Sequence, residues 1–262
     1  MAASFPAALP RTALVTGGAR RLGRATALAL AEAGFDVAVH TRPGGAEAAN
    51  DTAAAIRRVG RRAVVLRADL AREADTERLL PAASAALGPI GVLINNASAF
   101  ERDTWDSVTR ASWDAHLEPN LRAPFVLMQH FARALPATAE GAVINMLDQR
   151  VWSLTPLFVS YTVSKAALWT LTQSMALALA PHHIRVNAIG PGPALPSARQ
   201  TPEQFARQCA MVPLGRGTSP DEVARAVLAI LALPSMTGQM IALDGGQHLQ
   251  WASGRTDPPL EE

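Results

Sequence analysis

Short apolar segments alternate with longer amphipathic segments along almost the whole chain. Continuous apolar segments are typical of strands that are buried on both faces of a sheet, and intervening helices are typical of parallel pairing. The sequence therefore predicts one α/β domain, with a doubly wound parallel sheet of about seven strands and helices on both faces. The predicted strands are residues 12–16, 36–40, 63–68, 92–95, 142–146, 184–189 and 240–243, and the predicted helices are 21–33, 46–59, 73–87, 160–180 and 221–233.

We expect this domain to cover residues 12–250, after an N-terminal extension (1–11) and before a C-terminal tail (251–262). Between residues 96 and 141 we predict helical segments interrupted by Pro119 and Pro124, because proline lacks the amide hydrogen that a helix interior needs. The segment 190–217 is rich in proline and glycine, and residues 193–217 are interpreted as a substrate loop. The acidic segment 101–106 is interpreted as a solvated loop.

We expect a soluble protein of the cytoplasm. The net charge is only +2, and no aromatic residues lie between the clustered arginines of residues 57–62, so we expect no nucleic-acid partner. Cys209 is the only cysteine, which fits a reducing compartment. Residues 1–11 lack the pattern of a signal peptide, no apolar segment has the length of a membrane span, and the histidines lack metal-ligand spacing.

A glycine-rich segment, residues 16–23, follows the first predicted strand and begins the first helix. Glycines there allow the backbone to approach a pyrophosphate at the positive end of the helix, although glycine also serves in ordinary tight turns. In a doubly wound pattern this position indicates a Rossmann-type nucleotide site.

The residues after the second strand distinguish between the two nicotinamide dinucleotides. A carboxylate there would bind a ribose hydroxyl and repel a 2′-phosphate. The segment is instead His40-Thr41-Arg42, and Arg20 and Arg21 are expected nearby, so we predict NADP(H). The alternative is that these arginines are simply solvated at a strand end.

The single tyrosine and the single lysine, Tyr161 and Lys165, are four residues apart in a predicted helix. Residues with this spacing lie on the same helix face. The ammonium is expected to lower the tyrosine pKa, so that the phenol exchanges protons near neutral pH. The alternative is that the two are unrelated surface residues.

With the strand, the glycine turn, Asn95-Asn96-Ala97 and the Tyr161–Lys165 pair, the chain resembles the short-chain dehydrogenase/reductase family from about Thr12 to Gly246. The resemblance implies a proton donor (Tyr161), a ribose-binding and tuning lysine (Lys165) and an asparagine that orders a relay water (Asn120). It also implies a homotetramer, and the nearly all-apolar helix 166–179 is expected to pack partly on a second subunit. The cofactor-binding residues implied by the motifs are Gly17, Arg20, Arg21, Leu22, Gly23, His40, Thr41, Arg42, Asp69, Leu70, Asn96, Ala97, Ser98, Tyr161, Lys165, Pro191 and Gly192.

The sequence departs from the family pattern at Asp148. The family usually has a serine thirteen residues before the tyrosine, whereas Asp148 stands there and Ser153 has the wrong spacing. A carboxylate repels a developing oxyanion and accepts hydrogen bonds from N–H groups. Asp148 is therefore a candidate catalytic residue for a nitrogen heterocycle, or alternatively a turn cap.

A second departure is Arg21, which replaces the middle glycine of the turn. Both departures resemble the pteridine reductase and dihydromonapterin reductase branch. By that resemblance Phe100 stacks on a pterin, Ser98 contacts cofactor and substrate, and Arg21 bridges pyrophosphate and substrate. Phe100 as an apolar plug and Arg21 as a cofactor ligand alone remain alternatives.

The sequence thus predicts an NADPH-dependent reductase that transfers hydride to a C=N bond of a pterin, converting a dihydropterin to a tetrahydropterin. Asp148, Tyr161, Lys165 and Asn120 are its predicted catalytic residues. One alternative is a carbonyl reductase of the same family, acting on a 3-oxoacyl, sugar or xenobiotic ketone. The other is a non-catalytic nucleotide-binding regulator, against which the intact Tyr161–Lys165 pair argues.

Overall fold

The computed structural model describes residues 4–197 and 199–250, so the predicted tail 251–262 lies outside the described residues. One parallel sheet forms the centre of the molecule, with the strand order β3-β2-β1-β4-β5-β6-β7. The strands are β1 (Thr12–Val15), β2 (Asp36–Thr41), β3 (Ala63–Arg67), β4 (Val92–Asn95), β5 (Gly141–Met146), β6 (Ile184–Pro191) and β7 (Met240–Leu243). Every neighbouring pair is parallel, which confirms the predicted Rossmann-type sheet.

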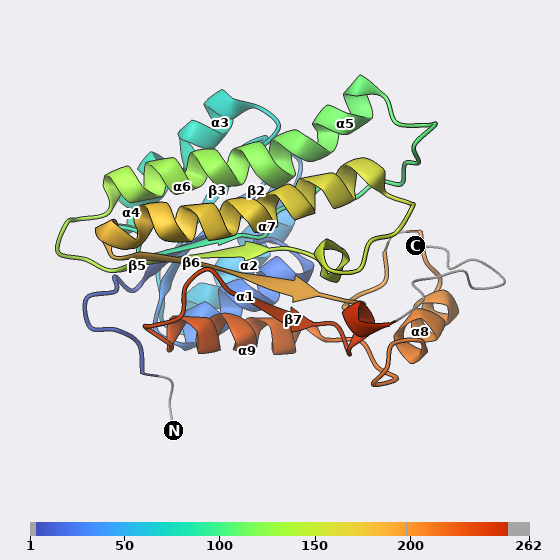
Figure 1. Ribbon diagram of the computed structural model, residues 1–262. Coiled ribbons are helices and arrows are strands. Elements are labelled where there is room, and N and C mark those ends of the chain that lie inside the picture. Colours follow the sequence, from blue (N-terminus) through green and yellow to red (C-terminus); the bar gives the residue numbers. More distant parts are fainter. Residues whose placement is uncertain (1–3, 198, 251–262) are drawn as a thin grey trace.

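Helices cover both faces of this sheet (Figure 1). One face carries α1 (Arg21–Glu32), α2 (Ala46–Arg58) and α9 (Pro220–Leu231), and the other carries α4 (Leu79–Leu87), α6 (Ala123–Ala134) and α7 (Val159–Leu179). Each face has its own apolar core: Phe35 and Ile230 belong to one, Leu93 and Phe131 to the other. From the predicted N-terminal extension, Phe5 packs edge-on against Phe35, with ring centroids 5.4 Å apart.

Two helical predictions need correction. The helix predicted over residues 73–87 is two helices, α3 (Glu73–Glu77) and α4, because Pro81 in the first turn of α4 has no amide hydrogen to continue the bonding pattern. Conversely, Pro119 and Pro124 do not interrupt the helical run from α5 (Arg110–Leu117) to α6. Pro119 lies in a π-helical turn, η1 (Glu118–Arg122), and Pro124 lies in the first turn of α6. A wider turn tolerates a missing amide hydrogen without ending the helix.

The segment 190–217 contains a helix that the sequence reasoning missed, α8 (Pro202–Ala210). Its signal is a capping box, in which Thr201 and Gln204 bond each other's backbone amides. Figure 1 shows α8 beside the carboxyl ends of the strands. The sheet order reverses between β1 and β4, and in folds of this kind ligands bind outside the carboxyl ends at that point.

Candidate active site

Two adjoining cavities lie at the carboxyl ends of the strands. The larger, about 560 Å³, follows the glycine turn and the ends of β2 and β3. The smaller, about 270 Å³, lies between the end of β5, the start of α7 and the segment after β6. Four residues line both cavities: Arg21, Leu22, Asn96 and Ser98. Every site residue predicted from the sequence lines one or both cavities, except Asn120.

The backbone of the glycine turn, residues 16–23, requires glycine at two positions. Gly17 has φ +63°, and a β-carbon on Gly23 would clash with the carbonyl oxygen of Gly17. Arg21 keeps φ +53°, a left-handed conformation that is unfavourable for a residue with a side chain. The backbone thus retains at Arg21 the shape that glycine ordinarily supplies.

His40 supports this turn with both ring nitrogens. Its Nδ1 accepts a hydrogen bond from Gly17 N at 3.2 Å, and its Nε2 lies 3.2 Å from Ala68 O, to which it donates in that tautomer. Burial lowers the pKa of His40 to about 4, although the bond to Ala68 opposes this change. His40 therefore lines the larger cavity as a neutral ring whose polar atoms hold the backbone.

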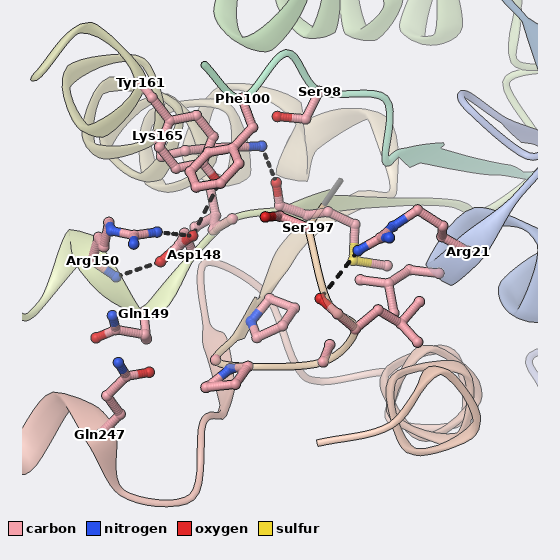
Figure 2. A pocket seen from close by; sticks show the side chains of 18 of the residues that line it. Arg21, Ser98, Phe100, Asp148, Gln149, Arg150, Tyr161, Lys165, Ser197 and Gln247 are labelled. Carbon is pink, nitrogen blue, oxygen red and sulfur yellow. Dashed lines mark hydrogen bonds and ion pairs between the residues drawn. The ribbon is translucent and has the colours of Figure 1, made fainter. Parts of the chain in front are cut away.

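The predicted catalytic pair lies in the smaller cavity, together with Asp148 (Figure 2). The Tyr161 hydroxyl donates to Asp148 Oδ2 at 3.0 Å, and Lys165 Nζ donates to Met146 O at 2.8 Å. Tyr161 and Lys165 are 6% and 2% exposed. The three side chains that the sequence selected are therefore neighbours in a buried setting.

The expectation of a lowered tyrosine pKa is wrong. Burial, followed by the Asp148 carboxylate, raises the pKa of Tyr161 well above its ordinary value, although Arg150 opposes this increase. Burial also lowers the pKa of Lys165 to about 8, against the attraction of Asp148. The phenol consequently keeps its proton at neutral pH, which suits a proton donor better than a base.

Asp148 both caps a turn and contacts the tyrosine. Its Oδ1 accepts from Arg150 N at 2.8 Å at the start of a 3₁₀ turn, η2 (Gln149–Val151). Its Oδ2 lies 3.2 Å from the Arg150 guanidinium as well as accepting from Tyr161. Ser153 does not line the cavity, so it does not substitute for the usual hydroxyl there.

Asn120 lies in the π turn η1, only 1% exposed. Its amide accepts from Ala99 N at 2.8 Å, and donates to Ala99 O at 3.0 Å and to Ser164 Oγ at 3.1 Å. Asn120 thereby joins the segment after β4 to α7. Its predicted role in ordering a relay water stays a prediction.

Phe100 forms one wall of the smaller cavity. Its ring stacks on Phe158, with centroids 4.6 Å apart, and meets Tyr161 edge-on at 4.7 Å. Phe158 covers one face of the Phe100 ring, and the guanidinium carbon of Arg199 lies over the ring, 5.4 Å from its centroid. A flat ligand can therefore stack on Phe100 only where Arg199 moves away from the ring.

Arg21 contacts the predicted substrate loop, which the sequence did not indicate. Its guanidinium donates to Pro196 O at 2.8 Å and to Leu195 O at 3.2 Å (Figure 2). The glycine turn and the loop are thereby connected beside both cavities.

A buried chain of hydrogen bonds behind the site was also missed. His116 Nε2 accepts from Glu101 N at 2.9 Å, His116 Nδ1 lies 2.7 Å from Ser160 Oγ, and Ser160 Oγ bonds the Asp103 carboxylate. Asp103 is 5% exposed, so the prediction of a solvated loop over residues 101–106 is wrong at this residue. Nothing in an acidic segment of sequence indicates that one of its carboxylates caps a distant helix.

Comparison with known proteins identifies the family. Residues 17–248 match the family model described as enoyl-(acyl carrier protein) reductase. A short-chain dehydrogenase/reductase of Armillaria gallica is 32% identical, and the match covers 90% of this chain and 95% of that protein. The chain belongs to the short-chain dehydrogenase/reductase family.

The chain is similar to proteins that are named for different substrates. The cis-4-hydroxycyclohexanecarboxylate dehydrogenase of Sinomonas cyclohexanicum is 35% identical, with coverage of 90% of this chain and 96% of that protein. The crystal structure of FolM alternative dihydrofolate reductase 1 from Brucella canis, complexed with NADP, is 47% identical, has a TM-score of 0.89, and covers 94% of this chain and 97% of that one.

The part of the chain that the structure describes contains no group of three or more His, Cys, Asp or Glu side chains placed to hold a metal ion. None of the helices within residues 4–197 and 199–250 is long and apolar enough to cross a membrane.

Proposed function

We propose that this short-chain dehydrogenase/reductase reduces a C=N bond of a pterin with NADPH, converting a dihydropterin to a tetrahydropterin. The observation that carries the proposal is the Asp148 carboxylate, bonded to the Tyr161 hydroxyl at 3.0 Å. A carboxylate at this point disfavours a carbonyl oxygen that becomes negative, and favours a ring that presents N–H groups. The 47% identical FolM structure supports the same assignment.

The larger cavity fits NADP(H). It begins at the N-terminus of α1, where amide groups favour a pyrophosphate, and Asp69 and Leu70 border its far end. Where β2 ends, the cavity is lined by Thr41 and Arg42, with Arg20 beside them, and these residues suit a 2′-phosphate. Pro191 and Gly192 line the smaller cavity, where we place the nicotinamide.

When bound, the reduced nicotinamide supplies a hydride to the carbon of the C=N bond. The ring nitrogen must then gain a proton, and Tyr161, whose raised pKa keeps it protonated, donates it. Asp148 orients the hydroxyl by accepting its hydrogen bond, and Lys165, whose Nζ donates to Met146 O, would hold the cofactor ribose. Phe100 supplies an aromatic surface on which the flat ring stacks, a contact worth about 0.5–1.5 kcal/mol beyond burial.

Carbonyl reduction is the second candidate, because several relatives are named for hydroxyl or ketone substrates. The L-xylulose reductase of Mesocricetus auratus, for example, is 34% identical, with 90% of this chain and 96% of that protein covered. In that case Asp148 would serve only as the cap of η2.

The test is NADPH oxidation by the purified protein with 7,8-dihydrobiopterin, beside L-xylulose and a 3-oxoacyl thioester. We expect turnover of the pterin, with kcat/KM at least about tenfold higher than for either ketone, and a preference for NADPH over NADH. Ketone turnover without pterin turnover would establish the carbonyl reductase instead.

A further inference from the structure

One end of the smaller cavity contains a buried side-chain amide whose oxygen accepts no hydrogen bond from the described residues. Gln149, the first residue of η2, lines the cavity and is 6% exposed. Its Oε1 is buried and has no hydrogen-bond partner among the residues that the structure describes. Leaving a buried polar atom unpaired costs about 1–3 kcal/mol, so such a residue indicates a partner that is not part of the folded chain.

A second amide faces Gln149 across the cavity. Gln247 begins the 3₁₀ turn η4 (Gln247–Leu249), and Figure 2 shows the two side chains approaching each other below Asp148. A β-carbon on Gly192 would lie 2.8 Å from Asp244 Cα and 3.0 Å from Gln247 Oε1, so glycine at this position allows the segment after β6 to approach the η4 turn closely.

The turn that carries Gln247 is well fixed. Asp244 accepts from Gly246 N at 3.0 Å and from His248 N at 2.8 Å, and His248 Nδ1 lies 2.7 Å from the same carboxylate. The His248 ring also packs against Trp152, which follows η2, with centroids 5.1 Å apart. The two turns that carry Gln149 and Gln247 are thus held together.

Other glutamines of the cavity are already engaged. Gln200 Nε2 donates to Gln208 Oε1 at 2.8 Å, and Gln200 Oε1 accepts from Ser197 N at 2.9 Å. The polar groups that a ligand meets at this end of the cavity are therefore those of Gln149 and Gln247.

The charges around this end favour a neutral ligand group. Asp148 is paired with Arg150 at 3.2 Å, so the two charged side chains beside Gln149 offset each other. An amide presents both donors and an acceptor, which match a hydroxyl or a carboxamide.

We propose that Gln149 and Gln247 form a subsite for an uncharged substituent of the substrate that carries hydroxyl or carboxamide groups. This inference rests on the proposed function, because the substituent projects from the ring that Asp148 and Phe100 hold. The subsite makes the enzyme selective among flat heterocycles that differ only in their side chains.

The test compares two substrates that differ at that substituent, 7,8-dihydrobiopterin with a dihydroxypropyl group and 6-methyl-7,8-dihydropterin with a methyl group. Wild type is measured beside Gln149→Met and Gln247→Met, which keep side-chain length and remove the amide. The control is Gln239→Met, because Gln239 is exposed just before β7 and lines neither cavity. Thermal unfolding shows whether each variant is folded. If one of the two glutamine variants does not fold, the other alone tests the subsite.

We expect kcat/KM for dihydrobiopterin to fall about tenfold in each variant, through KM, as for the loss of a hydrogen bond in a binding site. For the methyl compound we expect a change of less than about twofold. Equal losses for the two substrates, or no loss for either, would overturn the subsite while the proposed function stands. A wild type that reduces neither pterin would overturn the proposed function and the subsite with it.

Discussion

At the scale of single residues, one carboxylate determines the character of the site. Asp148 accepts from Tyr161, is paired with Arg150, and contributes to raising the Tyr161 pKa. The tyrosine therefore holds its proton more firmly than the sequence suggested. The residue therefore begins a reduction protonated, as a proton donor must.

The first prediction concerns that proton. Tyr161→Phe removes the hydroxyl and keeps the ring that Phe100 meets edge-on. We expect kcat for the pterin to fall about 10²–10⁴-fold, the usual contribution of a positioned acid. NADPH binding, followed by fluorescence titration, should change far less. Retention of more than about a tenth of kcat would show that another group donates the proton.

The sequence predicted the central residues but not their partners. The four-residue spacing of Tyr161 and Lys165, and the thirteen-residue spacing of Asp148 and Tyr161, can be read from the sequence alone. Arg150 was missed because an arginine near an aspartate carries little information in a chain with 24 basic residues. The unpaired oxygen of Gln149 is a property of packing, which no local pattern encodes.

At the scale of elements, the glycine turn depends on a neutral histidine. Because burial lowers the pKa of His40 from 6.5 to about 4, the unfolded chain takes up a proton before the folded chain does as the pH falls. The stabilisation that comes from this pKa difference is fully present above pH 6.5, and it should be lost as the pH falls from 6.5 to 4.

The second prediction follows from this difference in the His40 pKa between the folded and the unfolded chain. We expect the free energy of unfolding of wild type, measured relative to His40→Gln, to decrease from pH 7 to pH 4.5 by at most about 3 kcal/mol. Urea titrations of both proteins across this range provide the measurement. A difference that does not depend on pH would contradict a neutral buried His40.

The chain of bonds from Asp103 to Ser160 connects the Phe100 segment to the start of α7. Asp103 accepts from the amide of Ser160, at 3.3 Å, as well as from its hydroxyl. Asp103 also bonds Phe158 N through its carbonyl oxygen at 2.8 Å. Phe158 has φ +57°, and these bonds hold that left-handed residue before Tyr161.

The third prediction is that Asp103→Ala destabilises the fold by about 1–3 kcal/mol, because Ser160 and its amide lose a buried partner. We also expect a lower kcat, since Phe100 and Tyr161 lose their shared support. Asp106→Ala, at an exposed position of the same segment, is the matched control and should leave both quantities unchanged. Chemical denaturation and steady-state kinetics measure the two effects, and equal behaviour of the two variants would refute the role of Asp103.

The boundaries of the helices were harder to predict from the sequence than those of the strands. The apolar strand β4 was predicted to the residue, because burial on both faces imposes a continuous apolar pattern. The edge strand β7 was also predicted to the residue, although only Met240 of it is buried. The helices around Pro81 and Pro119 were not, since a proline ends a helix, begins one or lies in a π turn according to its surroundings.

At the scale of the whole molecule, the sheet order explains how distant residues meet. The reversal between β1 and β4 places the glycine turn beside Asn96, while β5 carries Asp148 toward α7. Alternation of strands and helices predicted a doubly wound parallel sheet, and the structure supplies its strand order. The homotetramer remains a prediction: α7 packs beside α5 and the sheet, yet Leu177 on its outer face is 80% exposed.

The most direct test of the account is the substrate preference of Asp148→Ser, which restores the hydroxyl that the family usually has. We expect the ratio of kcat/KM for 7,8-dihydrobiopterin to that for a ketone such as L-xylulose to fall at least about tenfold relative to wild type, because the carboxylate that favours N–H groups is gone. The same ratio in the two proteins would contradict the claim that Asp148 selects a nitrogen heterocycle.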